Sequence, residues 1–97
     1  MTGPEPVVYY SGQAVEAVDK IEADPEALDL WNGICDCLDL ILDHPDSAPA
    51  RRDALRTATG TTVWRVTVRV PCEVDIWAIL WHQDDTGRIL IAFVGRL

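Results

Sequence analysis

The sequence predicts a small α+β fold of order βααβββ, in which an N-terminal helical hairpin packs on a small antiparallel sheet. The first half contains two segments whose apolar residues recur at helical spacing, and the second half contains β-prone apolar segments separated by turn residues. The length of 97 residues suits one folding unit, so we expect residues 1–97 to form a single domain.

The N-terminal region predicts a short strand followed by a helix. Val7–Tyr10 is an apolar, β-prone tetrad that suits a first strand or an edge extension of the later sheet. Ser11 can accept hydrogen bonds from the free N–H groups of a helix start, and the residues after it predict a helix over 12–23. Its apolar stripe consists of Ala14, Val15, Val18 and Ile21.

A second helix is predicted to begin at Asp24-Pro25, because Asp caps free N–H groups and Pro at the first helical position loses no hydrogen bond. His44-Pro45 ends it, since a residue before proline avoids helical dihedral angles. The conformation of the connector 46–59 is not predicted uniquely, because its middle, 50–58, suits a helical turn or a short third helix. The apolar stripe of the second helix consists of Leu28, Trp31, Ile34, Cys35, Leu38, Ile41 and Leu42.

Three strands are predicted after the connector. Thr61–Val70 alternates between apolar and polar residues, so it predicts a half-buried strand that ends at Pro71. Val74–His82 and Ile89–Val94 are apolar on both faces, and Asp84-Asp85-Thr86-Gly87 predicts the hairpin loop between them.

The two-sided apolar strands predict a surface for a partner. Two helices can cover only one face of the sheet, so Trp77, Ile79 and Trp81 are candidate partner-binding residues on the other face. The alternative is that the connector and the chain ends fold over these residues.

Charge and cysteine content limit the functional classes. The first 48 residues contain eleven acidic residues and one basic residue, whereas the remaining 49 contain five and seven. The net charge of −8 disfavours nucleic-acid binding by overall electrostatics. Three cysteines without a second ligand pair predict free thiols and no metal site. Free thiols suit the cytoplasm. We also expect no cofactor. No apolar run predicts a membrane span.

Several short motifs occur in an informative order. They are Tyr9-Tyr10-Ser11-x-x-Ala14, Asp53-Ala54-Leu55, Gly60-x-x-x-Trp64-Arg65-Val66, Ile76–Trp81 and Ile91–Arg96. Together with the order of the elements, they resemble the RelE/ParE toxin superfamily over nearly the whole chain. The resemblance implies a toxin of a bacterial toxin–antitoxin pair. In this superfamily one branch cuts mRNA on the ribosome and another inhibits DNA gyrase.

The resemblance also implies site residues. Asp53 matches the general base of some members, and Arg65, Arg69 and Arg96 are candidate cations for the scissile phosphate. From its place at a strand end, His82 is a further candidate for proton transfer, although a structural role is the commoner one. Candidate nucleic-acid-binding residues are Arg51, Arg52 and Arg56.

Three departures count against catalysis. Asp75-Ile76-Trp77 stands where catalytic members carry an arginine, the C-terminal His or Tyr of some members is missing, and the chain is acidic. We therefore expect an incomplete catalytic set and a role through protein binding, to a cognate antitoxin or a cellular target. One alternative is an active ribosome-dependent mRNA endonuclease, with the ribosome and mRNA as partners. Another is a structural or regulatory homodimer without catalysis.

Overall fold

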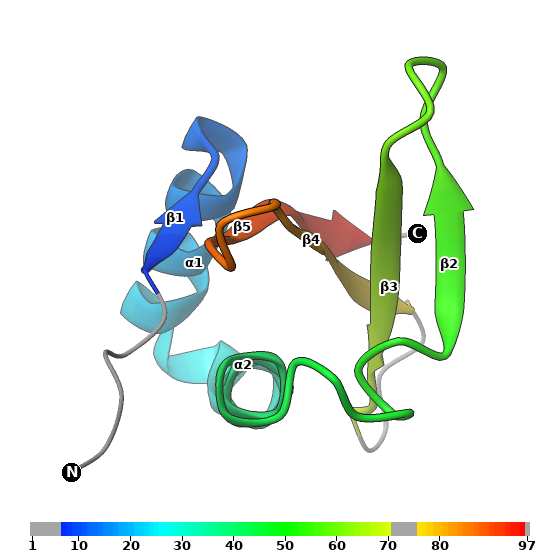
Figure 1. Ribbon diagram of the computed structural model, residues 1–97. Helices are drawn as coiled ribbons and strands as arrows, with labels where there is room; N and C mark the ends of the chain where they lie inside the picture. The colour runs from blue at the N-terminus through cyan, green and yellow to red at the C-terminus, as the bar shows by residue number, and fades with distance from the viewer. Residues whose placement is uncertain (1–6, 71–75, 97) are drawn as a thin grey trace, which may run out of the picture.

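The computed structural model describes residues 7–70 and 76–96, which form two helices on a five-stranded mixed sheet (Figure 1). Across the sheet the strand order is β1-β5-β4-β3-β2, with β1 parallel to β5 and the other neighbours antiparallel. In chain order the elements are β1 (Val8–Tyr10), α1 (Gly12–Ala23), the 3₁₀ turn η1 (Pro25–Ala27), α2 (Leu28–Asp43), β2 (Asp53–Arg56), β3 (Thr62–Val68), β4 (Trp77–Gln83) and β5 (Ile89–Arg96).

Ser11 joins the first helix to the sheet. Its Oγ accepts a hydrogen bond from the backbone N–H of Ala14 at 3.1 Å, which confirms the predicted N-cap. The same hydroxyl donates to the carbonyl of Ala92 at 2.7 Å, and the Ser11 backbone N–H donates to Ile91 at 3.0 Å. The predicted first strand is confirmed as β1, which pairs with β5 at the edge of the sheet.

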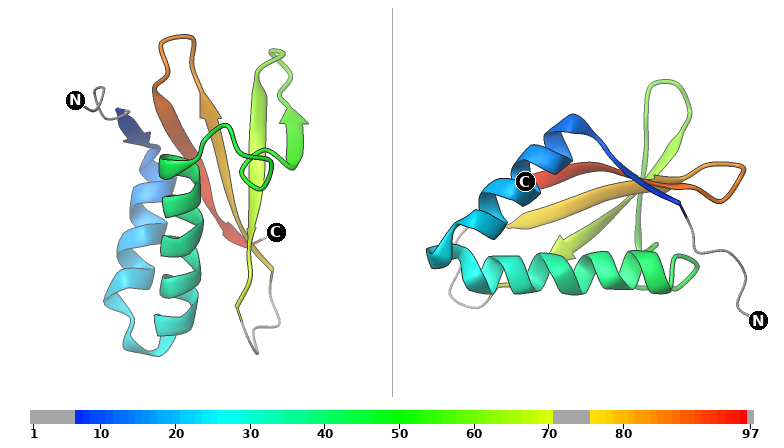
Figure 2. Two further views of the ribbon diagram at one scale, coloured as in Figure 1. Left: turned by 60° about the horizontal axis from the view of Figure 1, so that its bottom comes forward. Right: turned by 90° about the vertical axis from the view of Figure 1, so that its left-hand side faces the viewer.

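The two helices run in opposite directions on one face of the sheet (Figure 2). Asp24 Oδ1 accepts from the N–H of Glu26 at 2.9 Å, so the predicted start signal forms η1, and the α-helix continues from it. α2 ends at Asp43, one residue before the predicted His44-Pro45 boundary. Within the described ranges, neither helix is long and apolar enough to cross a membrane.

The predicted order βααβββ requires a correction, because the connector contains an additional strand. β2 pairs with β3 through a turn in which Thr57 N–H donates to the carbonyl of Thr61 at 2.9 Å. Gly60 occupies the left-handed region at φ +87°, where glycine is favoured. The antiparallel part of the sheet therefore has four strands. The predicted connection at 71–73 and strand start at Val74 lie outside the described residues.

The expected partner-binding patch also requires a correction. Ile79 and Trp81 are 0% exposed, and Trp77 packs partly buried against the same core. Ile79 pairs with Val66 and Trp81 pairs with Trp64, so all of these side chains point to the face that the helices cover. The core of the chain itself therefore buries this patch.

The outer face of β4 and β5 is covered from within the sheet. A Cβ atom at Gly95 would lie only 2.6 Å from Cζ of Phe93, so the phenyl ring lies directly over this glycine. Gly95 pairs with Ala78, which is fully buried although no helix lies on its face (Figure 2). The Phe93 ring therefore shields part of the outer face of these two strands.

Removing a core side chain of α2 should destabilise the fold strongly. Ile34 is 0% exposed at the centre of the helix–sheet core, so Ile34→Ala should lower the free energy of unfolding by about 2–5 kcal/mol. Leu28→Ala in the same helix is the matched control, because Leu28 is 59% exposed. Urea denaturation measures both variants, and equal losses would contradict this placement of the core.

The β4–β5 turn should contribute stability that depends on pH. Hydrogen bonds from the side chain of Thr86 and from Arg88 hold the pKa of Asp84 well below its ordinary value. A depressed pKa contributes stability above the unfolded-state pKa, and this contribution is lost as the pH falls. The urea midpoint of Asp84→Asn should therefore lie below that of the wild type at about pH 6 and approach it at about pH 2. A difference that is independent of pH would count against this role.

Candidate anion-binding cleft

A cleft of about 300 Å³ is bounded by three parts of the chain: helix α2, the segment that leads into β2, and strand β3. We call it the arginine cleft, defined by Arg52, Asp53, Arg65 and Arg69. The remaining lining residues are Cys37 and Leu40 from α2, Pro49 before β2, and Val66 and Thr67 from β3.

The strand register brings the cleft residues together. Alternation along β3 places Arg65 and Thr67 on one face. Arg69 follows the last residue of β3, Val68, and lines the same cleft. Asp53 is directly opposite Arg65 across the β2–β3 pair, and pairing with β2 does not extend beyond Arg65. β3 therefore continues past its edge neighbour, and the open part of its edge forms one wall of the cleft.

α2 closes the cleft on the other side. The Sγ of Cys37 lies 3.8 Å from the carbonyl oxygen of Thr67, which it meets as a weak donor. One turn earlier, a Cβ at Gly33 would lie 3.3 Å from the carbonyl oxygen of Arg69 and 3.0 Å from Val68 Cγ1. The absence of a side chain at Gly33 thus lets the helix approach the edge of β3.

The cations of the cleft are only partly neutralised. Arg65 Nη2 lies 3.6 Å from Asp53 Oδ2, a long contact, and Arg65 Nε is buried without a hydrogen-bond partner. Arg52 and Arg69 form no ion pair with any carboxylate of the described chain. Three arginines therefore line the cleft with one carboxylate, an excess of positive charge that favours binding of an anion.

The cleft offers little for proton transfer. Burial raises the pKa of the Cys37 thiol, with Asp36 as the smaller cause, so this sulfur stays protonated at neutral pH. Asp53 is the one carboxylate among the described lining residues. The arrangement suits electrostatic binding better than acid–base chemistry, which also needs a group to protonate the leaving oxygen.

The other two predicted catalytic residues lie elsewhere. His82 lines a separate hollow at the β4–β5 hairpin, together with Tyr9, Asp84 and Arg88. The guanidinium of Arg96 lies 5.5 Å from the ring centroid of Trp77, at the end of β5. The structure therefore groups Asp53, Arg65 and Arg69 from the predicted catalytic set and separates His82 and Arg96 from them.

Of the three predicted nucleic-acid-binding residues, only Arg52 lines the cleft. Arg51 is engaged in contacts within the chain. Its guanidinium lies 4.3 Å from the centroid of the Trp64 ring, and its Nε donates to the carbonyl of Pro45 at 2.6 Å. Its Nη2 also contacts Asp46 at 2.9 Å and Gln83 at 3.0 Å. Arg56 is exposed at the end of β2 and is not among the lining residues.

Cys37 and Leu40 are cleft residues that the sequence did not indicate. They lie outside the apolar stripe predicted for this helix, although both pack against the core. Nothing local signals that α2 packs against a strand about thirty residues later. Thr67 shares a strand face with Arg65 and Arg69, so its position was recognisable from the alternation. No group of three His, Cys, Asp or Glu side chains suited to a metal ion occurs in the described part of the chain.

Comparisons with known proteins found no matching family model, no matching curated protein and no matching solved structure.

Arg51 should contribute to the stability of the fold, whereas the nearby Arg56 of β2 should not. Arg51→Ala removes the stacking on Trp64 and three hydrogen bonds, so we expect the free energy of unfolding to fall by about 2 kcal/mol. Arg56→Ala is the matched control and should change it by less than about 0.5 kcal/mol. Thermal or urea denaturation separates the two outcomes. An unchanged stability of Arg51→Ala would contradict this stabilising role.

Proposed function

We propose that this chain is a toxin-type protein of a bacterial RelE/ParE-like toxin–antitoxin pair, and that it acts in the cytoplasm by binding a partner protein through the arginine cleft. The observation that carries the proposal is that Arg52, Arg65 and Arg69 line one cleft in which, among the described residues, the single carboxylate, Asp53, contacts only Arg65. The partner is the cognate antitoxin or a cellular target, and it presents an acidic segment to these arginines.

A binding role accounts for the cleft better than RNA cleavage. Cleavage through the 2′-hydroxyl needs a base, an acid for the leaving oxygen and cations for the phosphate. The cleft holds the cations and Asp53, whose carboxylate faces Arg65, while His82 lines a different hollow. The acid is therefore missing from the described lining residues.

The surroundings of the cleft favour a short acidic segment over a long phosphate backbone. Asp36 and Asp39 flank the lining residue Cys37 in sequence and are exposed on α2. A polyanion crossing the cleft would pass close to this helix and would meet its negative charge. A peptide can instead direct one or two carboxylates at the arginines, each in a charge-assisted hydrogen bond.

RNA cleavage remains the second candidate function, because three of the residues that the resemblance implies, Asp53, Arg65 and Arg69, line one cleft. In this case the chain would act on mRNA in the ribosome, with Asp53 as the base. A homodimer without catalysis is the third candidate. Its sedimentation coefficient would rise with concentration in the absence of any other protein.

The test is binding to the product of the adjacent reading frame, measured by co-purification and calorimetry. The double variant Arg65→Ala, Arg69→Ala should weaken binding by about a hundredfold, because each arginine supplies a charge-assisted hydrogen bond worth about tenfold in affinity. Arg56→Ala, an exposed arginine outside the cleft, should bind like the wild type.

Equal binding by the double variant and the wild type would refute a role of the cleft in partner recognition. Controlled expression of the chain alone provides the second measurement. Fragmented mRNA that disappears with Asp53→Asn would establish the nuclease in place of the binding protein. Intact mRNA together with weakened partner binding by the double variant would support the proposal.

A further inference from the structure

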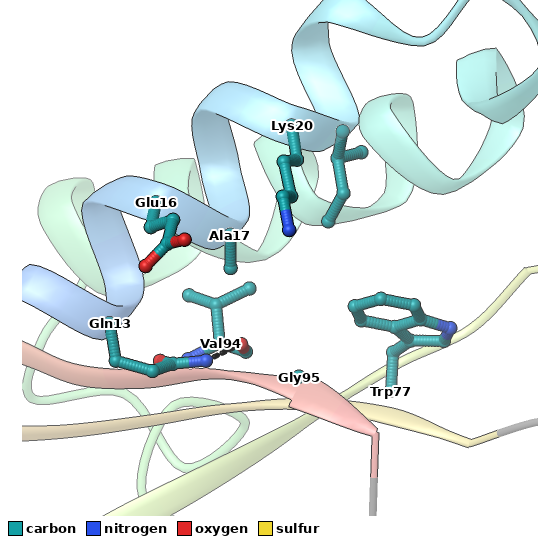
Figure 3. A pocket seen from close by; sticks show the side chains of 8 residues that line it. Gln13, Glu16, Ala17, Lys20, Trp77, Val94 and Gly95 are labelled. Carbon is teal, nitrogen blue, oxygen red and sulfur yellow. Dashed lines mark hydrogen bonds between the residues drawn. The ribbon is translucent and has the colours of Figure 1, made fainter.

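We propose that another hollow, at the edge of the sheet opposite the arginine cleft, binds a free amino acid with an apolar side chain. This hollow, the Trp77 pocket, has a volume of about 280 Å³ and lies between α1 and the ends of β4 and β5 (Figure 3). Its volume is close to the lower limit of small-molecule sites, which suits a ligand of the size of one amino acid.

The shape of the pocket follows from the spacing along α1. Gln13, Ala17 and Ile21 are four residues apart, so they lie on the helix face toward the sheet. Gln13 fastens the helix to β5: its Nε2 donates to the carbonyl of Val94 at 2.7 Å, and its Oε1 accepts from the Val94 N–H at 3.0 Å. One turn later, Ala17 offers only a methyl group, which leaves the space beneath the helix open.

The walls of the pocket are apolar. Ala17 and Ile21 contribute from the helix, and Val94 and the indole of Trp77 contribute from the sheet. Figure 3 shows the Trp77 ring standing on the sheet beside Val94, with its benzene edge toward the pocket. Such walls favour an apolar side chain, and an aromatic one gains ring–ring contact with the indole.

Two opposite charges decide the class of ligand. Glu16 and Lys20 line the pocket one helical turn apart, yet they form no ion pair with each other or with any other described residue. Both side chains point toward the sheet over the pocket (Figure 3). An amino acid can place its carboxylate at Lys20 and its ammonium at Glu16, with its side chain against Trp77. A simple carboxylic acid would instead meet repulsion from Glu16.

Calorimetry or NMR titration with L-phenylalanine tests the proposal on the full chain. Three partial ligands isolate the contacts: glycine lacks the side chain, 3-phenylpropanoate lacks the ammonium, and phenethylamine lacks the carboxylate. Each should bind about tenfold or more weakly than L-phenylalanine. Glycine binding as tightly as L-phenylalanine, or 3-phenylpropanoate binding as tightly, would overturn the assignment.

Variants on α1 complete the test. Lys20→Gln should weaken L-phenylalanine binding about tenfold but leave phenethylamine unchanged, and Glu16→Gln should weaken L-phenylalanine but not 3-phenylpropanoate. Asp19→Asn is the matched control, because this residue is exposed on the same helix and does not line the pocket. No detectable binding of L-phenylalanine to the wild-type chain, or an equal loss with Asp19→Asn, would refute the site.

Discussion

The burial of Trp81 is the constraint on which the rest of the structure depends. Its side chain is 0% exposed, and the centroid of its ring lies 5.0 Å from that of Trp64. A buried indole N–H without a partner would cost about 1–3 kcal/mol, and here it donates to the carbonyl of Ala50 at 3.1 Å. This bond holds the segment before β2 against the core. The position of Ala50 in turn places Arg51 over the tryptophan rings and brings Arg52 to the arginine cleft.

Both hollows of interest lie where a long inner strand extends past a short edge strand. β3 continues beyond its pairing with β2, and α2 closes that open edge at the arginine cleft. β5 continues beyond its pairing with β1, and Ser11 and Gln13 close that edge next to the Trp77 pocket. Each helix satisfies part of the exposed backbone of one strand but does not fill all the space beside it. The same geometric feature therefore generates a cationic cleft at one edge and an apolar pocket at the other.

Local charge differs from overall charge in this molecule. The net charge of −8 predicts repulsion of anions at long range, but charges on a protein surface are screened beyond about 10 Å at moderate ionic strength. Within the arginine cleft, Arg52, Arg65 and Arg69 outnumber the single lining carboxylate. The cleft therefore has a local excess of positive charge although the chain as a whole is acidic.

Local patterns determined much of this fold. The capped helix at 12–23 and the alternating strand at Thr61–Val70 were predicted because caps, helical spacing and period-two alternation act between neighbours in sequence. The short, exposed β2 has no such pattern. In β4 both faces of the strand carry apolar residues, so the sequence did not indicate which face the helices would cover. The sequence by itself predicted that Arg65 and Arg69 lie on the same side of the chain, and both line the arginine cleft. Only the tertiary structure decided that Arg52 joins them and that Trp81 lies inside, because both depend on long-range contacts with α2 and the segment before β2.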